Sequence, residues 1–146
     1  MTNEASISQD EYERLHEFRY VIRRFLHFSE QAAREAGIDP QQHQLLLTIQ
    51  ARGAGTGIPI GEVAERLQVR HHTAVELVDR AAARSLVRRE ASALDRRQVL
   101  VSLTPEGARV LRGLSAAHIE ELRKAALSLV TVLAELAAAG RPVARP

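Results

Sequence analysis

Two long amphipathic stretches at the ends of the chain limit what it can fold into. After Ser8, apolar residues recur at spacings of three and four as far as residue 36, and a similar pattern runs from Pro105 to residue 139. Each stretch predicts a helix of about thirty residues, which is about 45 Å long at about 1.5 Å per residue. A single domain of 146 residues is narrower than such a helix.

The chain between these two helices is too short to cover both of their apolar faces. We therefore expect helices 8–37 and 105–139 to bury each other or a second copy of themselves, in an intertwined homodimer with two-fold symmetry. The alternative is a monomeric bundle in which the apolar faces close internally, and the pattern alone leaves both arrangements open.

Three helix starts are predicted by residues that cap unpaired backbone N–H groups. The pairs that indicate them are Ser8 with Glu11, Asp39 with Gln42, and Thr104 with Pro105. Gly37 is expected to end the first helix, and the glycine-rich run 53–57 is expected to end the second. The whole chain, 1–146, then reads as one unit with a central lobe at 40–103 and a flexible tail at 140–146.

Composition excludes several functional classes. The chain has no cysteine, which excludes disulfides, thiolate catalysis and Cys-ligated zinc. It also lacks the spaced motifs of phosphate loops, metalloproteases and serine hydrolases, so we expect no enzyme activity, no metal site and no cofactor. No apolar run is long enough to span a membrane and the first residues are polar, which predicts a cytoplasmic protein with no membrane partner.

Charge is unevenly distributed along the chain. The formal net charge is only +2, but residues 70–97 contain seven arginines and four acidic residues, a local balance of +3. A concentrated basic segment is typical of a surface that binds an anionic partner.

That basic segment coincides with a change of pattern. Residues 62–67 predict a short helix, 68–70 a turn, and residues from His71 onward a second helix, with the small Ala64 allowing the two to cross closely. Alternating apolar residues at 97–103 predict a strand that pairs with residues 86–90, with 91–96 near the hairpin tip. A helix-turn-helix followed by a two-stranded hairpin is a winged helix, so the predicted fold is mainly α with a small β wing.

At this point the residues resemble a known family. The runs Leu77-Val78-Asp79-Arg80, Asp95-Arg96-Arg97 and Leu103-Thr104-Pro105-Glu106-Gly107 are similar to those of the multiple-antibiotic-resistance-regulator (MarR) family of bacterial transcription factors. The resemblance implies a homodimer that binds pseudo-palindromic double-stranded DNA, usually as a repressor, and that is often released by a small ligand.

The predicted DNA contacts follow from the winged-helix geometry. The N-terminal end of the second helix would lie against base edges in the major groove, and the residues expected there are Arg70, His71, His72 and Thr73. Glu76 also faces outward; it either accepts from a cytosine amino group or pairs with a neighbouring arginine, and both interpretations stay open. Arg80 could serve the fold through a salt bridge as well as DNA.

In the wing, Arg97 matches the family arginine that enters the minor groove or grips its phosphates. Asp95 is expected to orient Arg97 by a charge-assisted hydrogen bond. Arg88, Arg89 and Arg96 are expected to contact the DNA backbone, and the alternative for the first two is an ordinary solvated surface.

Three residues depart from the family pattern. Gln68 stands where glycine is usual in the turn, Arg70 where a Ser or Thr cap is common, and Ser85 where a glycine often ends the recognition helix. A non-glycine residue can be held at φ > 0 at modest cost, so we expect the fold to survive.

The resemblance also implies an effector pocket between the dimerisation helices and the lobe. In this chain it would involve His16, Arg19, Tyr20, Arg23 and His43, with an arginine as counter-ion for an aromatic carboxylate. The sequence favours a simpler interpretation, in which these residues only pair with neighbours such as Glu13 and Glu17. An alternative for the whole protein is a winged-helix dimer that acts through protein contacts without specific DNA binding.

Overall fold

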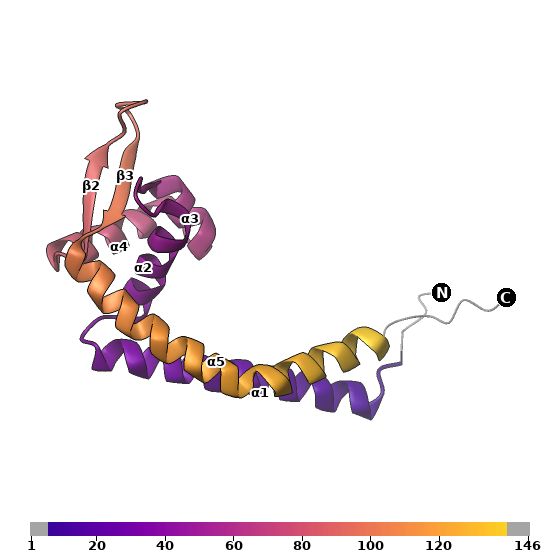
Figure 1. Cartoon of the computed structure of the whole chain (residues 1–146). Helices are drawn as coiled ribbons and strands as arrows, with labels where there is room; N and C mark the ends of the chain where they lie inside the picture. Colours follow the sequence, from indigo (N-terminus) through magenta and orange to yellow (C-terminus); the bar gives the residue numbers. More distant parts are fainter. Residues whose placement is uncertain (1–5, 140–146) are drawn as a thin grey trace, which may run out of the picture. The chain divides into compact units, whose positions relative to one another are not determined.

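The computed structural model describes residues 6–139 and contains five helices and three short strands in that range (Figure 1). The helices are α1 (Gln9–Glu35), α2 (Pro40–Gly53), α3 (Ile60–Leu67), α4 (His71–Ala83) and α5 (Pro105–Ala139). The strands are β1 (Ile58–Pro59), β2 (Val87–Ala91) and β3 (Val99–Leu103). None of these helices is long and apolar enough to cross a membrane in the described part of the chain. The tail predicted at 140–146 lies outside the described residues.

The chain forms two compact units, and both long helices contribute to each. One unit, called the lobe below, comprises residues 30–117, and the other, called the helical unit, contains the described residues 6–29 and 118–139. The predicted boundaries 8–37, 40–103 and 105–139 follow the helices, whereas the compact units divide α1 and α5 within their length.

The predicted caps are present at the helix ends. The backbone N–H of Ser8 donates to Glu11 Oε2 over 2.8 Å, and the N–H of Glu11 donates back to Ser8 Oγ over 3.2 Å, which satisfies two groups that α1 leaves unpaired. Gly37 follows α1 with φ 79°. At the start of α5 the Gly107 N–H donates to Thr104 Oγ1 over 3.0 Å.

The lobe has a single apolar core between its helices and its sheet. Leu45, Leu46, Val63, Val78 and Val101 are fully buried there, from α2, α3, α4 and β3. These residues are the inward-facing positions of the predicted helix and strand patterns, so burial of one face holds each element in place.

The sheet has one more strand than the sequence predicts. Its order is β1-β3-β2, with both pairs antiparallel, and Ile58 of β1 lies opposite Val101 of β3. β1 has only two residues, so it is too short to produce an alternating pattern that can be recognised in the sequence. The predicted hairpin is correct, with Val87 opposite Leu103 and Ala91 opposite Val99, and it projects from the lobe as a wing (Figure 1).

In the helical unit, α1 and α5 run antiparallel side by side. Arg14 pairs with Glu135 over 3.1 Å, and His118 Nε2 lies 2.7 Å from Ser29 Oγ. The rings of Phe25 and Phe28 meet His118 edge-on, at centroid distances of 5.8 and 5.4 Å. The unit nevertheless leaves many large apolar side chains exposed: Ile7, Tyr12, Leu15, Tyr20, Ile22, Leu26, Ile119, Leu122, Leu127, Val130 and Leu133.

Candidate nucleic-acid interface

A left-handed residue makes the tight turn between α3 and α4. Gln68 has φ 54° and ψ 44°, and its N–H donates to the carbonyl of Glu65 while Val69 donates to that of Ala64. These bonds close the C-terminal end of α3 as a glycine would, in agreement with the expectation that the fold survives at this departure. Ser85, with φ 58°, plays the same part after α4.

Arg70 is the N-cap of α4 and forms no side-chain cap bond, as its residue type predicts. Its guanidinium is therefore not engaged in closing the helix. Arg70, His71 and His72 are exposed and Thr73 is half-buried, while Ala74 directly after them is fully buried. The structure thus brings the four predicted residues together at the start of α4.

Further along α4, Glu76 and Arg80 are exposed, and neither forms an ion pair with another residue of the described range. Pairing of Glu76 with a neighbouring arginine, one of the two predicted alternatives, is therefore not observed within the chain. The acid of this helix that does pair is Asp79, which contacts Arg89 of β2.

Arg89 thus lies on the face of the wing that meets α4. The side chain is 37% exposed and is held by the Asp79 carboxylate, whereas the sequence predicts it only as a DNA-backbone contact or a solvated surface residue. Arg88 points to the opposite face of β2 because successive side chains of a strand alternate.

The wing tip is built around Ser92 and Asp95. Ser92 is buried, its hydroxyl accepts from the N–H of Asp95, and its own N–H donates to the Gln98 carbonyl. Asp95 Oδ1 accepts from the backbone N–H of Arg97 over 3.0 Å. A hydrogen bond between Asp95 and Arg97 is thus present as predicted, and it is made to the Arg97 backbone, because a carboxylate two residues before an N–H readily closes a local turn.

The side chains of Arg96 and Arg97 remain exposed at the tip, and neither makes an ion pair with another described residue. The turn thus holds their backbone while both guanidinium groups stay available to an external anion.

Sequence reasoning missed Arg84 at the C-terminal end of α4. Its guanidinium donates to Gln42 Oε1 over 3.0 Å and to the carbonyl of Gly37. These bonds tie the end of α4 to the first turn of α2 and to the loop before it. The helix pattern shows Arg84 only as a polar position at a helix end, and nothing in its spacing indicates the partners.

Gly107, the last residue of the run from Leu103 to Gly107, stands where a larger residue would not fit. A Cβ on Gly107 would overlap the carbonyl oxygen of Leu86, because the first turn of α5 packs directly against the chain that leads into β2. Thr104 reinforces the junction through an N–H that donates to the Leu86 carbonyl over 3.1 Å.

This arrangement of capped α5, wing and helix-turn-helix has counterparts among known proteins. Residues 36–98 match the sequence model of the MarR family. Through this segment the chain resembles the MarR family. No curated protein sequence matches the chain.

Solved MarR-type structures share its fold. AbsC, a MarR family transcriptional regulator from Streptomyces coelicolor, superimposes with a TM-score of 0.74 at 22% identity, over 96% of this chain and 95% of that one. The YusO protein of Bacillus subtilis matches with 0.66 at 21% identity, over 93% and 100% of the two chains. Staphylococcus aureus MepR, solved in complex with DNA, matches with 0.63 at 22% identity, over 76% and 83%.

At these identities the likeness establishes the fold, a MarR-type winged helix.

The residues predicted for an effector pocket are divided between the two units. His16, Arg19, Tyr20 and Arg23 are exposed on the part of α1 in the helical unit, and His43 is buried in the lobe on α2. Neither Arg19 nor Arg23 pairs with Glu13, Glu17 or any other described acid, so the simpler interpretation of these arginines is not observed.

Proposed function

We propose that this MarR-type protein is a transcriptional regulator that binds double-stranded DNA, with α4 in the major groove and the wing in the minor groove. The proposal depends on two observations in the lobe. The start of α4 presents the exposed Arg70, His71 and His72, and the wing tip presents Arg96 and Arg97, which make no ion pair with another described residue. Exposed histidines and a half-buried threonine suit base edges, and exposed arginines suit phosphates or a narrow minor groove.

Within this proposal the remaining residues take different roles. Glu76 faces the groove without an internal partner and would accept from a cytosine amino group. Arg80 would contact a phosphate. Asp95 acts through the backbone of the wing, and Arg89 supports α4 through Asp79.

We further propose a homodimer formed by α1 and α5, which places two copies of the lobe on a pseudo-palindromic operator. The support is the row of exposed apolar side chains on both helices of the helical unit, including Leu26 at 50% exposure and Leu127 at 79%. Exposed apolar surface of this extent is unfavourable in water and is typical of an interface.

The last part of the proposal is that the protein represses transcription and is released from DNA by an aromatic or lipophilic ligand. The residues expected near that ligand are His16, Arg19, Tyr20, Arg23 and His43. This part is supported by the family resemblance and by Arg19 and Arg23, which have no counter-ion among the described residues. A reporter driven by the bound promoter, with and without the gene for this protein, distinguishes repression from activation.

The central test is footprinting and quantitative binding on the DNA upstream of the protein's own gene. A protected, roughly symmetric site is expected, with affinity that falls linearly in log salt concentration. Arg97→Ala should weaken binding and reduce the salt slope by about one. Arg123→Ala is the matched control, because it removes an exposed arginine of the helical unit that pairs only with Glu120. Absence of any specific duplex, with a shallow slope, would indicate a protein-interaction module.

The dimer is tested separately by sedimentation equilibrium. Leu26→Glu should weaken self-association strongly, because it places a charge in the proposed interface. Leu47→Glu is the control, since Leu47 is exposed to 48% on α2 of the lobe, nearly the 50% of Leu26. A wild-type chain that sediments as a monomer at micromolar concentration would overturn the dimer.

A further inference from the structure

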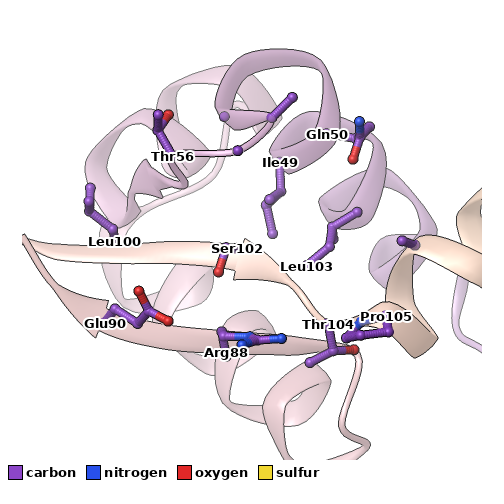
Figure 2. A pocket seen from close by; sticks show the side chains of 14 residues that line it. Ile49, Gln50, Thr56, Arg88, Glu90, Leu100, Ser102, Leu103, Thr104 and Pro105 are labelled. Atoms are coloured by element: carbon purple, nitrogen blue, oxygen red, sulfur yellow. The ribbon is translucent and has the colours of Figure 1, made fainter.

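A cavity of about 440 Å³ lies within the lobe, away from the start of α4 and the wing tip. Its walls are the face of β2 and β3 that carries Arg88, the loop between α2 and β1, and the first turn of α5 (Figure 2). We propose that this cavity binds a small zwitterion, with a carboxylate at Arg88 and an ammonium group at Glu90.

Opposite charges stand side by side on one wall. Arg88 and Glu90 both lie on β2, opposite Ser102 and Leu100 of β3, and all four residues line the cavity. They share one face of the sheet, because residues directly opposite in an antiparallel pair point the same way. Figure 2 shows the Arg88 and Glu90 side chains along β2, with Ser102 above them.

Neither charge is satisfied within the described part of the chain. Arg88 and Glu90 make no ion pair with each other or with another described residue, whereas Arg89 between them is held by Asp79 on the other face. The wall therefore presents a free cation and a free anion to whatever enters the cavity.

Residues of the apolar core border the cavity on its other side. Ile49 is 1% exposed in the lobe core, and Leu103 packs against that core. Both residues border the cavity, Ile49 from α2 and Leu103 from the end of β3 (Figure 2). A volume of about 440 Å³ is within the range of small-molecule sites.

The spacing of the two charges selects the ligand class. Residues two apart on a strand are separated by about 6.6 Å, from a rise of about 3.3 Å per residue. A linear amino acid whose amine lies several carbons from its carboxylate spans this separation, and its methylene chain would lie beside Leu100, which is opposite Glu90 on the same face. A ligand with one charge would satisfy one residue and be repelled by the other, so zwitterions are favoured over simple anions or amines.

This site is independent of the proposed DNA binding. In this proposal Arg88 binds the ligand's carboxylate at the base of the wing and is no longer one of the predicted DNA contacts. Because β2 and the first turn of α5 both contribute to the walls, a bound zwitterion would join the wing to α5 within the lobe.

The test is a titration of the full-length, isotope-labelled protein followed by backbone amide NMR. The probes are 4-aminobutyrate and 6-aminohexanoate, with hexanoate and hexylamine as single-charge controls. Saturable shifts are expected at Thr56, Ser102 and Thr104 with at least one zwitterion, and binding of either control should be weaker by about tenfold or more. No saturable shift with either zwitterion, or equal binding of hexanoate, would overturn the proposal.

Variants localise the binding. Arg88→Gln and Glu90→Gln should each weaken the zwitterion by about tenfold or more, because each removes one charged partner. Arg96→Gln is the matched control, since it removes an exposed arginine of the wing outside the cavity. Exchange of the two charges, Arg88→Glu with Glu90→Arg, should restore binding, because the ligand can bind in the reverse direction. Equal affinity in Arg88→Gln and the wild type would refute the assignment.

Discussion

Asp79 of α4 and Arg89 of β2 form an ion pair that joins the second helix of the helix-turn-helix to the wing. Asp79 lies on the helix proposed to enter the major groove, and Arg89 lies on the strand that leads to the wing tip. The pair therefore directly links the two elements proposed to bind DNA, outside the apolar core. Since the side chains are 53% and 37% exposed, it is a surface pair with a small effect on stability.

We predict that breaking this pair lowers DNA affinity more than stability. Asp79→Asn should reduce the free energy of unfolding by about 1 kcal/mol or less, while operator binding weakens because the wing is less firmly positioned. Arg89→Ala should change the salt slope less than Arg97→Ala does, because Arg89 is engaged with Asp79. Chemical denaturation and binding over a range of salt concentrations measure the two effects. A full unit of slope lost in Arg89→Ala would mean that this arginine contacts a phosphate.

Gly107→Ala should be strongly destabilising. The added Cβ overlaps the carbonyl oxygen of Leu86, which is backbone and cannot turn aside, so α5 must shift, at a cost of about 2 kcal/mol or more. Gly113→Ala on the same helix is the control, because nothing lies within 4 Å of its added Cβ. It should stabilise α5 by about 0.5–1 kcal/mol, through helix propensity alone. Thermal denaturation of both variants gives the comparison, and a loss of stability in both would show that packing against Leu86 is not the cause.

Gln68→Gly should increase the free energy of unfolding by up to about 1 kcal/mol. Gln68 is held at φ 54°, where a side chain costs energy and glycine does not. Glu65→Gly, on the exposed side of α3, should instead lower stability by about 1 kcal/mol, since glycine is unfavourable within a helix. Denaturant titration measures both changes. A decrease in Gln68→Gly would mean that side-chain contacts of Gln68 outweigh its backbone strain.

The cap of α1 should be visible in the titration of Glu11. Hydrogen bonds from the backbone N–H and the hydroxyl of Ser8 lower the pKa of Glu11 below its usual value. Because the folded-state pKa is depressed, the cap contributes stability above the ordinary carboxylate pKa and loses it as pH falls through the lowered value.

Ser8→Ala should therefore raise the pKa of Glu11 toward its usual value, as followed by carboxylate carbon NMR. Glu106 is the internal control, because its pKa is lowered by a hydrogen bond from Arg109 and should not respond to the variant. An unchanged Glu11 titration in Ser8→Ala would show that the cap does not cause the shift.

Much of the fold is predictable because it depends on local chemistry. The starts of α1, α2 and α5 follow from Ser8, Asp39 and Thr104, each of which satisfies or precedes unpaired N–H groups of the next turn. The hairpin follows from alternation of apolar residues. β1 could not be predicted because two residues are too few to show an alternating pattern. It is a strand only because Ile58 pairs with Val101 of β3.

The candidate site likewise has a part that the sequence predicts and a part that it does not. The sequence alone placed His71 and His72 at the start of a helix and Arg97 at the tip of a hairpin, because caps, turns and periodicity act over a few neighbouring residues. Only the tertiary structure decided which arginines remain available. Arg89 meets Asp79, Arg84 meets Gln42, and Arg88 faces a cavity beside Glu90. Most of these partners lie on different elements, and Arg88 and Glu90 share one face of a single strand. Electrostatic interactions depend on distances in space, and the sequence does not give those distances.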